Sequence, residues 1–348
     1  MSKNINNRKS FTSISKIGEF GLIEKISKQF KPSHENTIKG IGDDAAVIKV
    51  GESCIVISKD FLVEGIHFDL MYNPLKHLGY KSVVVNLSDI ISMNVIPTQI
   101  LISIAFSNRF SVEAIDDFYS GVKLACNRYN VDLIGGDTTS SNKGFTVSVT
   151  ATGISKESEI VYRSGAKENN LIVLSGDVGA AYLGLQILER EKAVFEVNSK
   201  MQPEFEGSEY LLERQLKPEA RLDIINSLKK LDVKPTSMID ISDGLSSELN
   251  HLAKSSSIGF RIFEDKLPIN SAVHEFSEKF NLNPSICALN GGEDYELLFT
   301  LEQKDYDKIK HRPDMTIIGY VENKKMGCNL VTRDSKVHSL LSKGWKSH

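Results

Sequence analysis

The sequence lacks the features that mark secreted, membrane-spanning and nucleic-acid-binding proteins. Its four cysteines are widely separated and contain no C-x-x-C pair, so neither a disulfide framework nor a cysteine zinc site is expected. No run reaches the roughly 18 apolar residues that a membrane helix needs. The N-terminus, MSKNINNRKSFTSISK, has no apolar centre of the kind found in signal peptides. The net charge of −3 leaves no basic excess for a nucleic-acid surface. These absences predict a reduced, cytoplasmic protein that binds neither nucleic acid nor membrane.

Two common phosphate-binding signatures are also missing. The chain has no G-x-x-x-x-G-K-[ST] loop, and it has neither the Gly-rich loop nor the H-R-D motif of protein kinases. A phosphate ligand would therefore have to be held by other groups. Arg163, in the segment YRSGA, is the best-placed cation for that purpose; a solvated surface arginine is the alternative.

What the chain does contain is an alternation of expected strands and helices, which is typical of the α/β class. At 348 residues it is long enough for two cores. The polar stretch 155–159 predicts a boundary between a domain of residues 1–157, with 1–15 disordered, and a domain of residues 158–348. Strands are expected at 45–49, 53–58, 100–106, 131–134, 145–154, 171–175, 237–241, 259–263, 296–300 and 315–318. Helices are expected from Gly18, Pro74 and Ser111, and at 179–190, 209–214, 220–230 and 245–255.

Aspartates recur at the ends of expected strands and at the starts of other elements. Taken singly, most of them suit a turn or a helix cap. Asp89 differs, because it lies in an apolar helix, where a buried carboxylate is costly unless it is paired or coordinates a cation. The set comprises Asp43, Asp44, Asp60, Asp89, Asp137, Asp240 and Asp243.

The placement of these aspartates predicts a cation site. Carboxylates at the strand ends of an α/β fold are expected to converge at one edge of the sheet, where ligands bind. Converging carboxylates repel one another unless a hard cation neutralises them, and ligand sets made only of oxygen favour Mg²⁺ over zinc. Mg²⁺ held by acids commonly has phosphate on its other side. The aspartates together therefore predict a Mg²⁺–polyphosphate site.

Nine segments give the chain a resemblance to a known family. The sequence resembles thiamine-monophosphate kinases, in the superfamily that includes aminoimidazole ribonucleotide synthetase and selenophosphate synthetase. GIGDDAAV and the DISDGL type recur across the superfamily, whereas EGIHF, NLSD, GGEDYELLFT and KGWK together are specific to the kinase branch. The segments are GEFGLI (18–23), GIGDDAAV (40–47), SKDFLVEGIHF (58–68), NLSDIISMNVIP (86–97), GGDTT (135–139), RSGA (163–166), MIDISDGL (238–245), GGEDYELLFT (291–300) and KGW (343–345).

The resemblance implies a fold, a reaction and a set of residue roles. The implied fold has two α/β domains of the aminoimidazole ribonucleotide synthetase type, with the N-terminal domains of a homodimer pairing into a shared barrel-like sheet. The implied reaction is direct in-line transfer of a phosphoryl group from ATP to thiamine monophosphate, with several Mg²⁺ ions and no protein nucleophile. The implied metal ligands are Asp44, Ser58, Lys59, Asp60, Asp89, Asp137, Asp240 and Asp243. ATP contacts are implied for Ser58, Tyr119, Gly136, Asp137, Arg163 and Ser242, and thiamine monophosphate contacts for His67, Glu293 and Trp345.

Several of these positions have a plainer alternative. Asp43 would shape the turn beside Asp44, His67 could be a satisfied core residue, and Glu293 could serve turn chemistry. Lys59 replaces the small hydroxyl or aliphatic residue usual in the family. The change is tolerable if this position offers its backbone carbonyl to a metal, and it alters one metal site if the position offers a hydroxyl. Trp345 could be a terminal hydrophobic anchor. At the level of function, the alternatives are another ATP-dependent synthetase of the superfamily, or a non-catalytic regulator that binds Mg²⁺ and nucleotide.

Overall fold

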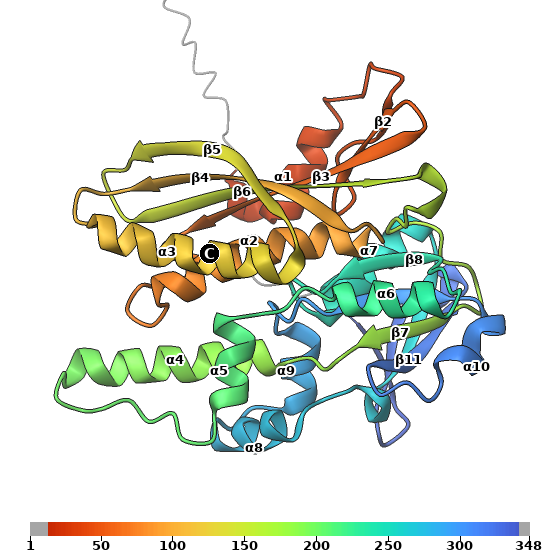
Figure 1. Cartoon of the computed structure of the whole chain (residues 1–348). Coiled ribbons are helices and arrows are strands. Elements are labelled where there is room, and N and C mark those ends of the chain that lie inside the picture. Colours follow the sequence, from red (N-terminus) through yellow and green to blue (C-terminus); the bar gives the residue numbers. More distant parts are fainter. Residues whose placement is uncertain (1–12, 341–348) are drawn as a thin grey trace, which may run out of the picture.

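The computed structural model of the chain describes residues 13–340, which form two β-sheets and their associated helices (Figure 1). The first half of the chain builds one sheet and the second half builds the other. The first half contains η1 (Ile14–Lys16), α1 (Gly18–Ser27), β1 (Thr37–Lys39), β2 (Ala46–Val50), β3 (Ser53–Val63), α2 (Leu75–Ser92), β4 (Pro97–Phe106), α3 (Val112–Tyr129), β5 (Asp132–Ser140) and β6 (Phe145–Ser155). The second half contains η2 (Glu157–Glu159), β7 (Leu171–Ser175), α4 (Ala180–Val197), α5 (Glu209–Leu216), α6 (Leu222–Lys230), β8 (Ser237–Asp240), α7 (Leu245–Ser256), β9 (Gly259–Phe263), α8 (Ser271–Lys279), α9 (Pro284–Asn290), β10 (Leu297–Leu301), α10 (Tyr306–Ile309), β11 (Met315–Glu322), β12 (Cys328–Val331) and β13 (Val337–Ser339).

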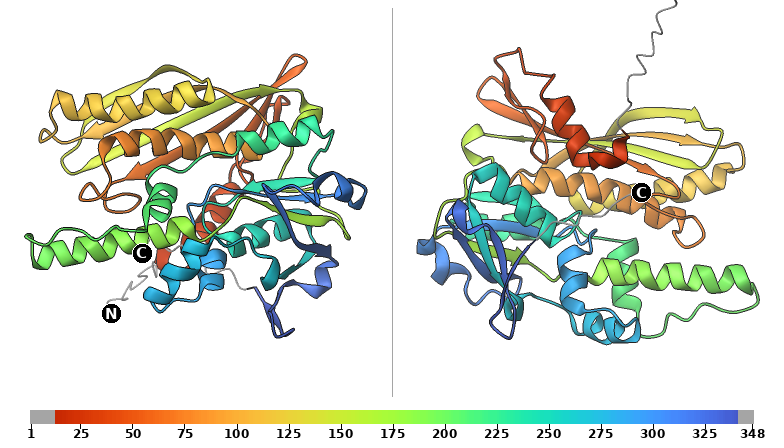
Figure 2. Two further views of the ribbon diagram at one scale, coloured as in Figure 1. Left: turned by 60° about the horizontal axis from the view of Figure 1, so that its bottom comes forward. Right: turned by 180° about the vertical axis from the view of Figure 1, so that it is seen from behind.

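The N-terminal sheet has the strand order β1-β2-β3-β6-β4-β5. Within it, β4 and β5 are parallel and the other neighbouring strands are antiparallel. Helices α2 and α3 lie side by side against one face of the sheet in every view (Figure 1 and Figure 2). Side chains of β3 alternate accordingly, because Val56 and Leu62 are buried whereas Phe61 points to the opposite face and is exposed.

The C-terminal sheet has the strand order β13-β12-β9-β11-β7-β10-β8, with β9 and β12 parallel and the other neighbours antiparallel. Its strands β7, β8 and β10 are buried along almost their whole length. The largest cluster of buried apolar side chains joins the two halves, since it contains Val84 and Val149 together with Phe299 and Met315. The two sheets therefore share part of one core, and the division into domains at 157/158 stays a prediction.

Most of the expected elements are present. The strands expected at 171–175 and 259–263 coincide with β7 and β9. The helix expected from Ser111 is α3, whose first turn is capped by the Ser111 side chain accepting a hydrogen bond from the Ala114 N–H. The helices and strands that the sequence did not predict are short: α8 and α9, both capped by asparagine, α10, and strands β1, β12 and β13. Most of the lead-in, residues 1–12, lies outside the described part of the chain, and η1 occupies its last positions.

Two expectations about the strands are wrong. The strand expected at 131–134 continues as β5 to Ser140, so Asp137 lies inside a strand and not at its end. Both sheets are mostly antiparallel, so strand ends do not all point to one edge, and the expected route by which the aspartates converge does not apply. The positions of the aspartates are instead determined by the packing of the two halves of the chain against each other.

The face of the N-terminal sheet opposite α2 and α3 carries no helix in the described residues (Figure 1). Apolar side chains are exposed on it: Phe61 is 58%, Leu101 37% and Ile154 57% exposed. Strand β5, at one edge, is exposed along its whole length. This sheet does not close into a barrel within residues 13–340. Among those residues, no helix combines the length and apolar character needed to cross a membrane.

Candidate active site

Three aspartates meet at the junction of the two halves. Asp44 comes from the loop before β2, Asp89 from α2 and Asp240 from the end of β8. One carboxylate oxygen of each lies within 4.8 Å of the corresponding oxygens of the other two. The acid cluster, as we call these three residues, therefore forms only because α2 packs against the C-terminal sheet at β8.

The acid cluster has the electrostatics expected of a cation site. Burial, together with repulsion from Asp60, Asp240 and Asp44, raises the pKa of Asp89 well above its usual value. Burial, with repulsion from Asp44, raises the pKa of Asp240 to about 7. In the described chain, Asp44 Oδ2 is buried and has no hydrogen-bond partner. Buried carboxylates with an unused oxygen and only oxygen atoms to offer fit Mg²⁺.

Neighbouring side chains orient these carboxylates. The Ser58 hydroxyl donates to Asp89 Oδ2, and the Ser88 hydroxyl donates to Asp240 Oδ2 at 2.6 Å. Strand alternation places Ser58 and Asp60 on the face of β3 that α2 covers. Burial raises the pKa of the Asp60 carboxyl to about 6. Ser58 and Asp60 thus lie beside the acid cluster, and the metal-ligand roles that the resemblance implied for them stay predictions.

Arg163 is part of the same site and is not a solvated surface residue. Its Nε and Nη2 atoms donate to Asp44 Oδ1 at 3.1 and 2.5 Å, and its side chain is only 22% exposed. Its backbone N–H donates to Asp43 Oδ1 at 3.0 Å, and Lys39 Nζ lies 3.0 Å from Asp43 Oδ2. Asp43 therefore fixes the loop that carries Asp44, which agrees with the turn-shaping role expected of it.

A second group of potential metal ligands lies at the start of α7. Asp243, Glu248 and His251 each place one ligand atom within 4.8 Å of the others. Glu248 Oε1 accepts hydrogen bonds from the backbone N–H groups of Ser242 and Asp243 at 3.2 and 2.8 Å. Burial lowers the pKa of His251 to about 4. Sequence reasoning missed Glu248 and His251; their i, i+3 spacing directly after DISDGL was the available signal.

Two predicted metal ligands, Lys59 and Asp137, lie on the outer face of the N-terminal sheet, away from the acid cluster. The Lys59 side chain points to the outer face of the sheet, where Nζ donates to Ser148 Oγ at 2.7 Å, so only its backbone could serve a metal on the other face. Asp137 is exposed and is paired in register with Ser103, which is itself paired with Ser148. Asp137 therefore shares the outer face with Lys59, opposite Asp60.

The remaining nucleotide positions are only placed by the structure, and their roles stay predictions. Gly136, in β5, approaches β4 so closely that an added Cβ would lie 1.7 Å from the Ile102 carbonyl oxygen. Tyr119 is half-buried on α3. Ser242 lies two residues after the end of β8, between Asp240 and Asp243 of the two ligand groups.

The residues expected to contact the acceptor divide into three cases. Glu293 has a positive φ of 60° and is held by side chains: its Oε1 lies 3.1 Å from Lys81 Nζ, and its Oε2 accepts a hydrogen bond from Gln215 Nε2 at 2.7 Å. Simple turn chemistry therefore does not account for it. His67 Nδ1 accepts a hydrogen bond from the Val63 N–H at 3.1 Å, which closes the turn after β3. Trp345 lies outside the described residues.

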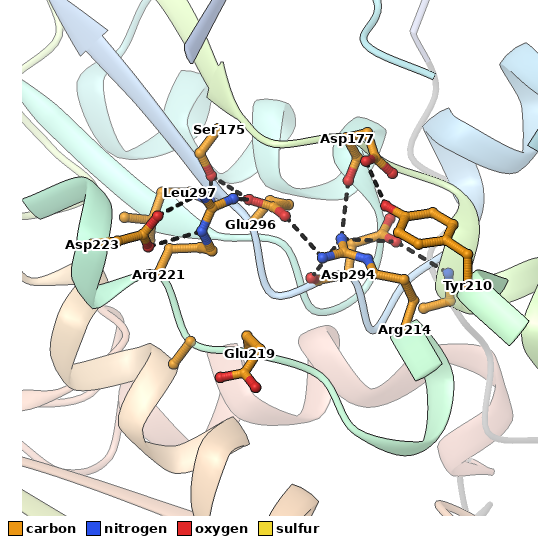
Figure 3. Close-up of polar contacts among 12 residues, drawn as sticks. Ser175, Asp177, Tyr210, Arg214, Glu219, Arg221, Asp223, Asp294, Glu296 and Leu297 are labelled. Carbon is orange, nitrogen blue, oxygen red and sulfur yellow. Dashed lines mark hydrogen bonds and ion pairs between the residues drawn. The ribbon is translucent and has the colours of Figure 1, made fainter. Parts of the chain in front are cut away.

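The rest of the GGEDYELLFT segment is structural. Asp294 accepts hydrogen bonds from the N–H groups of Gly179 and Ala181, at 2.8 and 3.3 Å, and so caps α4. The buried carboxylate of Glu296 binds Arg214 and Arg221 and accepts a hydrogen bond from the Ser175 hydroxyl (Figure 3). The segment therefore fixes one loop, from which Glu293 projects.

Comparison with known proteins assigns the chain to a family. The family model described as AIR synthase related protein, N-terminal domain, matches residues 42–155. The chain is 34% identical to the thiamine-monophosphate kinase of Aquifex aeolicus (strain VF5) over 333 residues, which cover 96% of this chain and 99% of the relative. The chain belongs to the thiamine-monophosphate kinase family. Another member, from Bacillus subtilis (strain 168), is 33% identical over 94% of this chain and 98% of its own length.

The fold of this thiamine-monophosphate kinase family member matches solved structures as well. The structure of AaThiL complexed with AMPPCP and TMP aligns with a TM-score of 0.82, at 34% identity, over 97% of this chain and 99% of that one. The superfamily resemblance given by the sequence segments is thereby confirmed, and so is the two-sheet α/β architecture that it implied.

Glu296 should be a large contributor to stability. Glu296→Gln keeps the side-chain shape but removes the carboxylate that lies 3.0 Å from Arg214, whose other carboxylate partner, Asp294, is 3.8 Å away. We therefore expect a loss of about 3–5 kcal/mol in the free energy of unfolding. Urea denaturation measures this loss. The control is Asp223→Asn, which removes the exposed partner of Arg221 and should cost less than about 1 kcal/mol. Equal, small losses in both variants would contradict the structural role of Glu296.

Stabilisation by Mg²⁺ should depend on pH. The folded pKa values of Asp60 and Asp240, about 6 and about 7, exceed the ordinary value of 3.8. The metal-free fold therefore loses stability as pH rises through the window between the ordinary value and these folded values. Mg²⁺ binds the ionised carboxylates and competes with protons below the window. We therefore expect Mg²⁺ to raise the melting temperature more above pH 7 than near pH 5, with KCl of matched ionic strength as control. The same Mg²⁺ shift at both pH values would contradict a site at these carboxylates.

Proposed function

We propose that this chain transfers the γ-phosphoryl group of ATP directly to thiamine monophosphate and so produces thiamine diphosphate. The observation that carries the proposal is the buried acid cluster beside Arg163, with the Glu293 loop next to it. Family membership supports the reaction, and the complex of AaThiL with AMPPCP and TMP supports the two substrates. The alternative of a non-catalytic regulator is not favoured, because every aspartate of the predicted metal site is present in the sequence.

For direct phosphoryl transfer the protein has to position the two substrates and neutralise their charge. Bound Mg²⁺ ions would neutralise the phosphate charges and so reduce repulsion between the two anionic substrates. Asp44, Asp89 and Asp240 would hold these ions, with Asp60 and Asp243 at their margins, and Ser58 and Ser88 orient the carboxylates. Arg163, tied to Asp44, would face the nucleotide phosphates. The acceptor oxygen belongs to a phosphate that is already ionised near neutral pH, so no strong general base and no protein nucleophile are needed.

The same proposal includes a cytoplasmic homodimer with a domain division at 157/158. The supporting observation is the outer face of the N-terminal sheet, which exposes Phe61, Leu101 and Ile154 and carries no helix in the described chain. An exposed edge strand such as β5 also favours pairing with a second chain. Two such sheets facing each other would form the shared barrel-like sheet, and Asp137 of each chain would lie at that interface.

Acceptor-dependent release of ADP tests the proposed reaction. With ATP and Mg²⁺, we expect thiamine monophosphate to trigger ADP formation together with an equal amount of thiamine diphosphate. Asp89→Asn should fold normally but lower kcat by about 100-fold or more, because the centre of the cluster loses a charge. Asp116→Asn, an exposed aspartate on α3, is the matched control and should keep wild-type rates. ADP release that requires a different acceptor, or full activity in Asp89→Asn, would overturn the proposal.

The oligomeric state tests the proposed dimer face. Sedimentation at micromolar concentration should give twice the chain mass of 38.7 kDa. Leu101→Asp places a charge on the outer face and should give monomers, whereas Val112→Asp places the same charge on exposed α3 and should not. A monomeric wild-type protein, or a dimer unaffected by Leu101→Asp, would contradict this interface.

A further inference from the structure

Lys81 is an unusual residue for the interior of a protein. It lies on α2, and only 2% of it is exposed. A lysine ammonium is rarely buried without partners, because desolvation of the charge is costly. Lys81 Nζ donates to the Gln215 carbonyl oxygen at 2.9 Å and lies 3.1 Å from Glu293 Oε1. Both partners belong to the second half of the chain, so this contact crosses the junction.

Each oxygen of the Glu293 carboxylate is contacted by a different side chain. Lys81 approaches Oε1, and the Gln215 side-chain amide donates to Oε2 at 2.7 Å. We call Lys81 and Gln215 the carboxylate clamp. An ionised carboxylate has about four acceptor positions, so one protein donor on each oxygen leaves acceptor capacity. The Glu293 side chain is 29% exposed, which leaves part of it accessible to a ligand.

The clamp rests on a rigid support. Arg214, the residue before Gln215, bonds to Glu296 and to the carbonyl oxygens of Asp177 and Asp294 (Figure 3). These bonds fix the end of α5 against the loop that carries Glu293. The positive φ of Glu293 is a costly backbone conformation for this residue type, and such conformations persist only where the surroundings hold them.

Glu293 lies directly beside the segment that carries Asp240 and Asp243. Its backbone N–H donates to the Ser242 carbonyl oxygen at 2.7 Å, and the Tyr295 N–H donates to the Ile241 carbonyl oxygen at 2.9 Å. The loop is therefore attached to the residues between Asp240 and Asp243. A carboxylate beside a phosphate site repels phosphate and attracts a cation or an N–H donor.

We infer that Lys81 and Gln215 are positioning residues that hold Glu293 for the nitrogen-bearing, cationic end of the acceptor substrate. The phosphate end of that substrate then lies toward the acid cluster. Thiamine monophosphate has both ends, a cationic ring system and a phosphate. This inference rests on the proposed function and adds to it the two residues that set the direction in which the acceptor binds. A lysine that only joined the two halves of the chain would affect both substrates alike.

A double-mutant cycle in the full-length protein tests the inference. Its members are wild type, Lys81→Met, Glu293→Gln and the double variant, each assayed for the KM values of thiamine monophosphate and ATP. We expect Lys81→Met to raise the KM of thiamine monophosphate by about ten-fold or more while the KM of ATP changes less than about two-fold. In the Glu293→Gln background, Lys81→Met should add little further, because it acts through Glu293. Lys76→Met, an exposed lysine on the same helix, is the matched control and should leave both KM values unchanged.

Other outcomes would contradict the positioning role of Lys81 and Gln215. Independent, multiplying effects in the cycle, or equal rises in both KM values, would show that Lys81 only joins the two halves. Should Lys81→Met fail to fold, Gln215→Met removes the second donor and keeps the carbonyl group that Lys81 contacts; an unchanged KM for thiamine monophosphate in that variant would overturn the clamp. Wild-type protein that makes no ADP with thiamine monophosphate would refute the proposed function itself. Normal wild-type turnover with unchanged Lys81→Met kinetics would refute the clamp alone.

Discussion

Mutual repulsion among buried carboxylates is the constraint on which this structure depends. Asp44, Asp89 and Asp240 lie within a few ångströms of one another, and burial raises the pKa of all three. A protein that kept them there for stability alone would be better served by apolar residues of similar size. In the proposed function a cation would bind between the carboxylates and offset their repulsion, so a cost in metal-free stability is expected of such a site.

The scaffold meets this constraint by bringing three separate parts of the chain to one junction. Helix α2 contributes most, because it carries Asp89 and Ser88 for the acid cluster and Lys81 for the clamp on Glu293. The β7–β8–β10 region of the second sheet contributes Asp240, and the network of Arg214, Arg221 and Glu296 fixes the loop next to it. On the proposed function, the phosphate end of the acceptor would lie toward Asp89 on α2, and its organic end would meet Glu293, which Lys81 of the same helix holds.

Local chemistry made part of this structure predictable. Ser111 signalled a helix start, and the apolar surroundings of Asp89 signalled a carboxylate that is removed from water, whose metal-binding role stays a prediction. The resemblance supplied the family and the other site residues. Contacts between distant segments could not be predicted from the sequence. It does not indicate that Asp60 and Asp137 lie on opposite faces of one sheet, or that Lys81 contacts Glu293, which is far from it along the chain. Such facts depend on strand register and on the packing of the two halves, which no local pattern encodes.

Anomalous scattering from crystals grown with Mn²⁺ and a non-hydrolysable ATP analogue tests the central claim most directly, because Mn²⁺ substitutes for Mg²⁺ at oxygen ligands. We predict strong peaks between the carboxylates of Asp44, Asp89 and Asp240, with the triphosphate on their open side. Nucleotide bound elsewhere, or an acid cluster that stays free of metal while the nucleotide is bound, would contradict the account.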